Sequence, residues 1–536
     1  MTRAEKILLP PALLLLAVSA YVHFVSGNAT DKNWLLIAAR MWISGKKLYV
    51  DIFEINPPLI VWLYSVPVFF SEHLFFLKDY QLLALMGLAL IGFVIALSDA
   101  ILKTHPAFAG EPGRRGFFAL LLAYVFVFFT APMYFLDREH ILLVLTFPYI
   151  LRFAPSFARL KLPMPLRVAV GVLGGVGFCI KPHAAIVFAV LQLIYLLRER
   201  SPVILASVEN LIVYIIGAAY LSTVVFLMPE YLHTVLPMAM ATYAAYSRKI
   251  TGIYSIITFI VIMGVTFADF RPRYRSPLRR EVYYFLGVCL AYLCYALANN
   301  GWAYTYNPLI SMARIVTGWV MLEFYWLARE ARAKDEPVKP FIFGARACVL
   351  NLTVNLLFYA CVLSSFFFTF DCQKNISCRA ESKFMAQARS LPAHSFGAMS
   401  LEFYKWSQLT RVTGWDWDTR FNHLWMLPQF ILSGPEFTRA HQSILDYVGN
   451  AYADDMNRRK PDVMYIDASP SFFSKQPYFD LVGYFSKAVP AFAEAFTHYR
   501  RTSVIDTCEA PDKDDPKSKG LQSDCRFDIY SRIPSP

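Results

Sequence analysis

Residues 8–34 read LLPPALLLLAVSAYVHFVSGNATDKNW, an apolar segment followed at once by a polar one that contains Asp31. The apolar part, Leu8 to Val25, is long enough to cross a lipid bilayer as a helix. A cleaved signal peptide is the alternative interpretation, but no convincing small-residue cleavage site follows, and many further apolar segments do. Asp31 therefore comes just after a predicted membrane span, where an ionisable group is a candidate for function because burying it without a partner is costly.

The composition is typical of a membrane protein with many spans. Of the 536 residues, 57% are hydrophobic and 17% are charged, whereas charged residues make up about 25% of soluble domains. The net charge of +12 is compatible with a nucleic-acid partner. We exclude that partner because the basic residues cluster in short loops between apolar segments, as they do in the cytoplasmic loops of membrane proteins.

The charges of the loops predict the topology. If the N-terminus is cytoplasmic, the large basic clusters all fall on one side, which supports about 11 helices and an external C-terminus. The segment Pro57 to Phe70 is left out of this count and is predicted to be an interfacial or re-entrant helix, after the amphipathic stretch Trp34 to Ile43. The predicted spans are residues 7–26, 80–102, 117–135, 140–155, 167–180, 183–197, 203–228, 252–269, 281–299, 308–327 and 341–368.

The fold class predicted from these patterns is an all-α polytopic membrane protein with a C-terminal α/β domain. Residues 1–370 form the transmembrane module, with interfacial helices in 27–76, and residues 371–536 form a soluble extracytoplasmic domain. Residues 461–467 and 526–530 are predicted to be strands of that domain, and residues 440–450 a helix.

Four of the nine cysteines lie in the predicted external domain, at Cys372, Cys378, Cys508 and Cys525. Cysteines in an oxidising compartment commonly form disulfides. Closeness in sequence favours the pairs Cys372–Cys378 and Cys508–Cys525, although three connectivities are possible. A structural zinc site is the weaker alternative, because the spacings fit no zinc-ribbon pattern.

The predicted topology gathers several polar side chains on the external side. A carboxylate there can act as a general base, Lys and Arg can bind phosphate, and an aromatic face suits a sugar ring. Simpler roles remain open: helix capping for the acids, snorkelling for Lys181 and an aromatic belt for Tyr304, while Asp51 and Glu54 are interpreted as a solvated loop. The candidates are Asp31, Asp137, Arg138, Glu139, His140, Lys181, His183, Arg248, Lys249 and Tyr304.

The order of these parts resembles the GT-C superfamily of polyprenyl-phosphate-dependent glycosyltransferases. The resemblance covers roughly residues 1–320 and is carried by Asp31, by GKKLYVD at 45–51, by NPPLIVWL at 56–63 and by DREHILLVL at 137–145. These motifs resemble those of one branch of the superfamily. That branch contains the lipid A aminoarabinose transferase, the protein O-mannosyltransferases and the rhizobial galacturonosyl transferases.

The resemblance implies an inverting sugar transfer at the outer face of a bacterial inner membrane, with the C-terminal domain in the periplasm. The donor would be a polyprenyl-phosphate sugar, and the acceptor an envelope glycan or lipid such as lipopolysaccharide. Asp31 would be the general base, and Asp137 and Glu139 of the second acidic motif would also be catalytic. The cations, with His140, His183 and Tyr304, would bind substrate. Many members carry Asp-Glu where this chain has Asp31-Lys32, so no essential metal is predicted.

Two other classes of function remain as alternatives. A transporter or flippase for a lipid-linked or anionic substrate would use the same charged cavity without chemistry, but the sequence has no clear internal repeat. A non-catalytic scaffold would use the external domain to bind a partner. Replacement of Asp31 separates these classes from an enzyme.

Overall fold

The computed structural model describes residues 3–26, 31–74, 76–200, 202–246, 279–299, 302–333, 376–401, 403–471, 477–508 and 523–534, with residues 256, 259, 260 and 473. The chain divides into two compact units. Met1–Asn28, Pro57–Leu227 and Ser247–Val362 form the first, which we call the helical unit, and Ala29–Asn56, Met228–Tyr246 and Leu363–Pro536 form the second, the sheet unit. The domain boundary predicted at residue 370 lies outside the described residues and stays a prediction.

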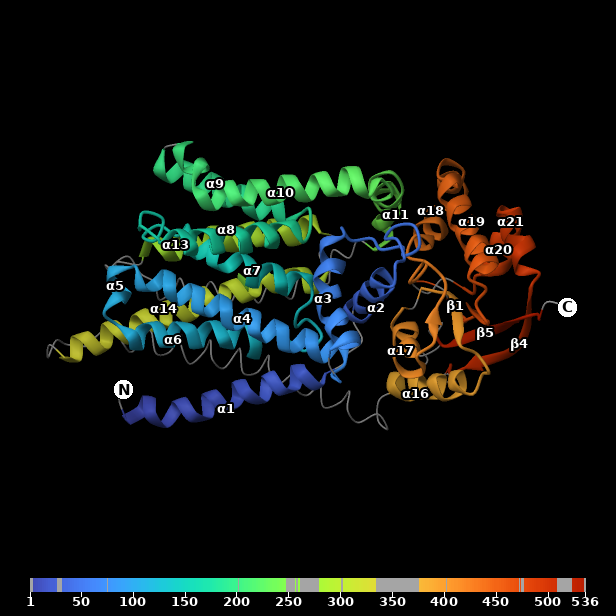
Figure 1. Cartoon of the computed structure of the whole chain (residues 1–536), viewed down its shortest axis with the longest axis horizontal. Helices are drawn as coiled ribbons and strands as arrows, with labels where there is room; N and C mark the ends of the chain where they lie inside the picture. The colour runs from blue at the N-terminus through green and yellow to red at the C-terminus, as the bar shows by residue number, and fades with distance from the viewer. Residues whose placement is uncertain are drawn as a thin grey trace. The chain divides into compact units, whose positions relative to one another are not determined.

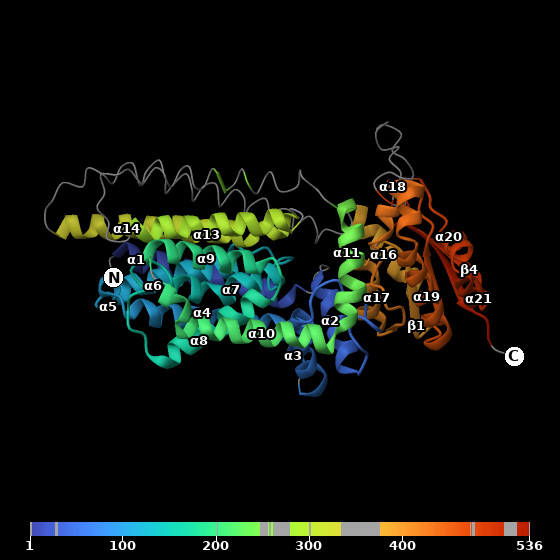
Figure 2. The same ribbon diagram turned by 90° about the horizontal axis from the view of Figure 1, so that it is seen from above.

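Long helices that lie side by side make up the helical unit (Figures 1 and 2). In Figure 1, α3 lies across the direction of the long helices. The elements of the helical unit are α1 (Arg3–Val25), α3 (Leu59–His73), α4 (Asp79–Lys103), α5 (Pro106–Ala109), α6 (Pro112–Ala123), η1 (Tyr124–Phe128), α7 (Arg138–Arg152), α8 (Met164–Cys179), α9 (Ala184–Glu199), η2 (Pro202–Ala206), α10 (Val208–Leu227), α13 (Arg279–Ala298), η5 (Ala303–Tyr306) and α14 (Asn307–Ala333).

Small residues let α8 pack closely between α7 and α10. A Cβ atom added at Gly177 would come within 2.7 Å of Thr146 on α7, and one added at Gly171 within 2.9 Å of Ile212 on α10. Close backbone approach through small residues is a common way for helices to associate in membranes. This packing leaves every residue of α7 buried, so α7 lies inside the helical unit.

The helical unit has the features of a membrane-spanning structure. By length and composition, α4, α10 and residues Arg280–Ala298 of α13 can each cross a membrane among the described residues. Large apolar side chains are exposed on these helices, among them Phe226 (77%) and Leu297 (57%). An extensive apolar surface of this kind is rare on a soluble monomer and suits lipid. The predicted membrane location is therefore confirmed.

The helix positions agree with the predicted spans. Each predicted span coincides with a helix of the structure, except 252–269 and 341–368, which lie mostly or wholly outside the described residues. The two helices predicted in the first loop are α2 (Asp31–Ile43) and α3.

The sheet unit contains a five-stranded sheet of order β2-β1-β3-β5-β4. β1 is parallel to β2 and β3, and β5 is antiparallel to both β3 and β4. The elements not yet given are η3 (Tyr231–Val235), α11 (Leu236–Thr242), η4 (Tyr243–Tyr246), α16 (Ile376–Arg389), β1 (Ser395–Met399), α17 (Tyr404–Thr413), β2 (Asp416–Trp417), α18 (Leu427–Ala440), α19 (Gln442–Arg458), β3 (Val463–Asp467), α20 (Leu481–Ala488), α21 (Pro490–Phe496), β4 (Tyr499–Asp506) and β5 (Arg526–Arg532).

Aromatic side chains join the helices of this unit to its sheet. The ring of Trp406 on α17 lies 5.1 Å from the rings of Tyr465 on β3 and Phe527 on β5, and 5.5 Å from Phe384 on α16. All four side chains are buried. The strands predicted at 461–467 and 526–530 are β3 and β5, and the predicted helix at 440–450 lies within α19, so the predicted C-terminal α/β domain is confirmed.

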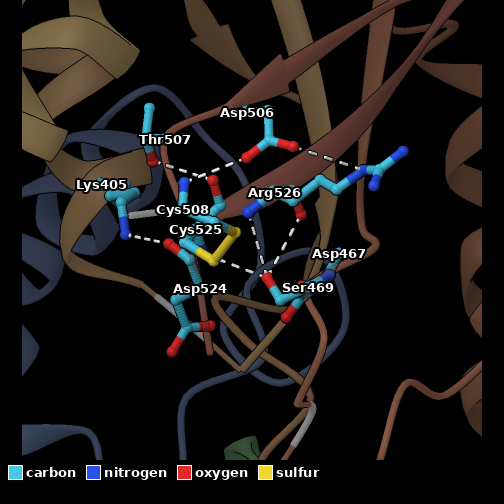
Figure 3. The surroundings of a disulfide bond; sticks show 9 residues. All are labelled: Lys405, Asp467, Ser469, Asp506, Thr507, Cys508, Asp524, Cys525 and Arg526. Atoms are coloured by element: carbon cyan, nitrogen blue, oxygen red, sulfur yellow. Dashed lines mark hydrogen bonds and ion pairs between the residues drawn. A yellow bond between two sulfur atoms is a disulfide. The ribbon is translucent and has the colours of Figure 1, made fainter. Parts of the chain in front are cut away.

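A disulfide joins Cys508 and Cys525 next to β4 and β5 (Figure 3). Ser469 Oγ accepts hydrogen bonds from the amides of Cys525 at 3.0 Å and Arg526 at 3.2 Å, which fixes the start of β5. This is the pairing that closeness in sequence predicts. Cys372 and the side chain of Cys378 lie outside the described part of the chain, and their pairing stays a prediction.

Candidate functional site

The N-terminal end of α7 holds four of the predicted site residues, Asp137 to His140. Asp137 is the N-cap, because its Oδ1 accepts a hydrogen bond from the amide of His140 at 3.1 Å. The preceding residue, Leu136, has a left-handed backbone with φ of 60°, and its amide donates to Nδ1 of His140 at 3.0 Å. Hydrogen bonds within the cluster therefore fix the first turn of α7, and the capping role considered for Asp137 is present.

Glu139 takes part in a buried ion pair. Its side chain is fully buried, and its Oε1 accepts hydrogen bonds from Nζ of Lys181 at 2.5 Å and from the hydroxyl of Tyr295 at 3.3 Å. Its second oxygen, Oε2, is buried without a hydrogen-bond partner among the described residues. Lys181 lies in the turn between α8 and α9, and Tyr295 lies on α13. Three parts of the helical unit thus meet at one carboxylate, which is stable in such a place only when it is paired.

An aromatic ring completes this cluster. The centroid of the Tyr304 ring lies 5.4 Å from Nζ of Lys181 and 5.9 Å from the guanidinium carbon of Arg138. Both distances suit cation–π contacts. Two cations, a carboxylate and an aromatic face therefore surround one place in the helical unit. Lys and Arg are the side chains that bind phosphate oxygens, so the arrangement can receive an anionic group.

The other predicted cations are not part of this cluster as described. His183 is half-buried at the N-cap of α9, and within the described residues no hydrogen bond or ion pair joins it to Glu139. Arg248 and Lys249 lie outside the described residues. Their predicted roles in binding substrate stay predictions.

Asp31 is the first residue of α2 and belongs to the sheet unit. Two contacts hold the residues that follow it. The indole Nε1 of Trp34 donates to Oε2 of Glu54 at 2.5 Å, and Oδ1 of Asn33 accepts a hydrogen bond from Nη1 of Arg411 at 3.0 Å. An acid in the first turn of a helix also interacts favourably with the helix dipole. The first turn of α2, which begins at Asp31, is therefore held in place. This arrangement is compatible with a structural role for Asp31 as well as with a catalytic one.

The interpretation of Asp51 and Glu54 as a solvated loop is wrong. Glu54 is 2% exposed and accepts hydrogen bonds from the backbone and side chain of Asn56. Asp51 is half-buried, and its Oδ1 accepts a hydrogen bond from Nη2 of Arg459 at 2.9 Å. Arg459 is 408 positions away from Asp51 in the sequence, so the polarity of the residues near Asp51 could not reveal that Asp51 is half-buried.

Several residues around these sites had no signal in the sequence. Tyr295, Arg411 and Arg459 have no motif around them, and only the folded chain brings them to their partners. Arg314 is different, because an arginine inside the predicted span 308–327 is itself a signal of function. It is buried, donates to the carbonyl of Phe129 at 3.0 Å and lies 5.0 Å from that ring.

No group of three or more His, Cys, Asp or Glu side chains placed to hold a metal ion occurs in the part of the chain that the structure describes. The prediction that no metal is essential stays a prediction, because the residues outside that part are not covered.

The fold of the chain has a counterpart among solved structures, as the resemblance to the GT-C superfamily implied. Among solved structures, the chain is similar to ArnT from Cupriavidus metallidurans bound to undecaprenyl phosphate, with a TM-score of 0.54, 13% identity and 98% of each chain covered. No family model and no curated protein matches the sequence.

Two further likenesses are weaker. ArnT in the apo state has a TM-score of 0.48 at 13% identity, with 97% of each chain covered. The archaeal oligosaccharyltransferase AglB from Archaeoglobus fulgidus, in complex with an inhibitory peptide and a dolichol-phosphate, has a TM-score of 0.41 at 10% identity, with 94% of this chain and 74% of that chain covered.

Proposed function

We propose that the protein is an integral-membrane glycosyltransferase that moves a sugar from a polyprenyl-phosphate donor to an envelope glycan or lipid on the outer face of the membrane. The observation that carries this proposal is the likeness over 98% of the chain to a protein solved with undecaprenyl phosphate bound. The cluster of the buried Glu139, Lys181 and Arg138 with the half-buried Tyr304 supports it, because it offers two cations to a phosphate at one end of α7.

The proposed reaction inverts the configuration at the sugar. The carboxylate of Asp31 removes the proton from the acceptor hydroxyl while that oxygen forms a bond to C1. The bond between C1 and the phosphate oxygen breaks, and polyprenyl phosphate leaves with the bonding electrons. The leaving group is a good one, so the protein mainly has to orient the reactants and stabilise negative charge as it develops on the phosphate.

The second acidic motif has a different part in this proposal. Lys181, with Arg138, interacts with the phosphate of the donor. Glu139 and Tyr295 hold Lys181 in place while the donor is absent, since a lysine buried without a counter-ion would lose its charge or its position. His140 keeps the first turn of α7 in shape through its bond to Leu136.

The test compares wild type, Asp31→Asn and a deletion strain, with the chains expressed in matched amounts. The control is Asp446→Asn, which removes a half-buried carboxylate on α19 of the same unit. Envelope glycans and lipid A are then compared by mass spectrometry. We expect a sugar-sized mass to be lost in the deletion and in Asp31→Asn and kept in Asp446→Asn, and that mass names the class of sugar.

A wild-type glycan profile from Asp31→Asn contradicts the proposed role of Asp31 as the base. In that case the transporter or flippase becomes the better hypothesis. A transporter should lose its function when Lys181 is replaced, because that residue would bind the anionic substrate even without chemistry. A scaffold should tolerate replacement of either Asp31 or Lys181.

A further inference from the structure

Residues 31–56, which we call the Asp31 segment, are bound in several places by residues 376–534, which we call the C-terminal domain. Both belong to the sheet unit. The two are separated by more than three hundred residues of sequence, and most of the helical unit lies between them in the chain. Three groups of contacts join them.

The first group of contacts is at α2. Arg411 on α17 donates to the buried Asn33 side chain at 3.0 Å, two residues after Asp31. The indole of Trp34 meets the indole of Trp417 edge to face at 5.2 Å between centroids. Asn33 and Trp34 are therefore both held from the C-terminal domain, one by a charged donor and one by an aromatic contact.

The second group is at Phe53. Its amide donates to the carbonyl of Arg420 at 2.9 Å, and its ring lies 4.7 Å from the ring of Phe421. Arg420 is itself fixed, because its amide donates to Oδ2 of the buried Asp455 at 2.8 Å and its side chain is paired with Asp455 at 3.0 Å. The backbone of the Asp31 segment is thus bonded to a rigid part of the C-terminal domain.

The third group is at Asp51. Arg459 donates to Oδ1 of Asp51 at 2.9 Å and to its backbone carbonyl at 3.1 Å. Two hydrogen bonds from one guanidinium fix both the side chain and the backbone at this point.

The loop around Tyr49, within the Asp31 segment, has an energetically unfavourable backbone conformation. Tyr49 is buried in a left-handed conformation with φ of 68°, its amide donates to the carbonyl of Ile52 at 2.7 Å, and its hydroxyl to the carbonyl of Asn56 at 2.8 Å. Its ring also packs 4.9 Å from the ring of Tyr231. A non-glycine residue keeps such a conformation only when the surrounding structure enforces it. The Asp31 segment is therefore built to adopt one conformation.

We infer that the C-terminal domain holds the Asp31 segment in the position needed for reaction, and that Arg411 and Arg459 are positioning residues. The catalytic consequence rests on the proposed function, in which Asp31 is the base. The holding itself does not, because it follows from contacts within the sheet unit. The domain is then part of the machinery of transfer, even if it never contacts a substrate.

The experiment measures hydrogen–deuterium exchange by mass spectrometry on the purified full-length protein, in wild type, Arg411→Ala and Arg459→Ala. Arg501→Ala is the matched control, because Arg501 forms an exposed ion pair with Asp528 on the sheet, at 2.6 Å. We expect exchange to become about tenfold faster in residues 31–43 for Arg411→Ala and in residues 44–56 for Arg459→Ala, since each loses a buried or half-buried charged hydrogen bond. The control should leave both regions unchanged.

A second pair of variants keeps the test valid if Arg411→Ala does not fold. Asn33→Asp keeps an oxygen that accepts from Arg411, whereas Asn33→Leu has a similar size and lacks it. Exchange in residues 31–43 should rise only in Asn33→Leu. If exchange in the Asp31 segment stays at the wild-type rate in Arg411→Ala, Arg459→Ala and Asn33→Leu, the inference is overturned, whatever the activity of Asp31→Asn.

Transfer activity is then measured in the same variants. Displacement of the general base should lower the rate of the chemical step more than the affinity for substrate. We therefore expect kcat to fall at least about tenfold in Arg411→Ala and Arg459→Ala, with KM little changed. Arg411→Lys should restore part of the kcat that Arg411→Ala loses. If exchange rises and Asp31→Asn is inactive but Arg411→Ala and Arg459→Ala retain full kcat, positioning for catalysis is wrong. If Asp31→Asn itself is fully active, the proposed function fails, and the exchange result still decides whether the domain holds the segment.

Discussion

Glu139 illustrates the chemistry of a single buried carboxylate in this protein. It is fully buried, so its charge is stabilised by Lys181 and by the hydroxyl of Tyr295 instead of water. The same low-dielectric surroundings make the pair strong when complete and costly when one partner is removed. The pair is therefore a structural link, and in the proposed function the phosphate of the donor competes with Glu139 for Lys181.

Removal of one partner of this pair should destabilise the protein more than removal of both. Lys181→Met leaves a buried carboxylate without its cation, which should cost about 3–5 kcal/mol, and the double change Lys181→Met with Glu139→Gln should recover most of that loss. The measurement is thermal unfolding of the purified proteins. In the proposed function the double variant regains stability without regaining transfer. Equal stability of Lys181→Met and wild type would contradict the buried pair.

The ion pair of Asp51 predicts a dependence of stability on pH. Burial alone would raise the pKa of Asp51, but the Lys47 amide and the guanidinium of Arg459 outweigh it and lower that pKa. Because the pKa is lower in the folded state, the stabilisation is complete above the unfolded pKa of about 3.9 and is lost as the pH falls through the folded pKa.

The measurement that checks this dependence compares the unfolding midpoints of wild type and Asp51→Asn across a series of pH values. The difference between them should be constant from neutral pH to about pH 5 and should shrink below about pH 4, where the unfolded wild type takes up a proton at Asp51 that the folded wild type does not yet bind. A difference that does not change down to pH 3 would show that the charge of Asp51 contributes no stability.

At the scale of elements, the position of α7 depends on how closely α4 approaches the residue before it. A Cβ atom at Gly87 on α4 would overlap the side chain of Leu136. Leu136 in turn has its carbonyl bonded to the hydroxyl of Tyr64 on α3 at 2.6 Å and its amide bonded to His140. One glycine on α4 therefore leaves the room that the left-handed residue before α7 needs.

Gly87→Ala should lower the stability of the helical unit by about 1–3 kcal/mol, because the added methyl group forces Leu136 to move. Gly92→Ala on the same helix is the matched control, since a Cβ atom there meets nothing within 4 Å. Thermal unfolding of the two purified variants is the measurement. The control should equal or exceed wild type, because alanine favours a helix over glycine. Equal changes in stability in Gly87→Ala and Gly92→Ala would show that the close approach of Gly87 to Leu136 does not limit the stability of the helical unit.

At the scale of the whole molecule, the two units are stabilised in different ways. The helical unit pairs its buried charges internally, as Glu209 does with Arg152 and Arg167, and exposes apolar side chains that suit lipid. The sheet unit has an aromatic core between helices and sheet, and a disulfide that joins the end of β4 to the start of β5. Its stability therefore depends on covalent chemistry as well as on packing.

Loss of this disulfide should destabilise the sheet unit. Cys508 and Cys525 are 17 residues apart, and a loop of about that length corresponds to about 3 kcal/mol. The measurement is protease resistance of the C-terminal domain in Cys508→Ser with Cys525→Ser. Reduced wild type provides the comparison. A larger loss on reduction than in the double variant would indicate the second predicted disulfide, Cys372–Cys378, and no loss in either would contradict a stabilising role.

The elements that sequence reasoning placed well are those that depend on local pattern. Long apolar segments predicted the spans of the helical unit, and the short segments 461–467 and 526–530 were predicted as two strands of the sheet. The interpretation of Asp51 and Glu54 as solvated was wrong, because their burial depends on partners that local polarity does not encode. Tyr295 could not be found at all, since one tyrosine in an apolar span resembles any other lipid-facing or packed aromatic residue.

Local features of the sequence predict a polytopic membrane protein with a C-terminal α/β domain, and they identify the acidic motifs at Asp31 and at residues 137–140. Apolar length and charge distribution are properties of short segments, so one chain suffices to see them. The folded chain is needed to see that Glu139 pairs with Lys181 and Tyr295, and that Arg411 holds Asn33. These partners are 42, 156 and 378 residues apart, and contacts over such separations arise only when the helices and the sheet have packed.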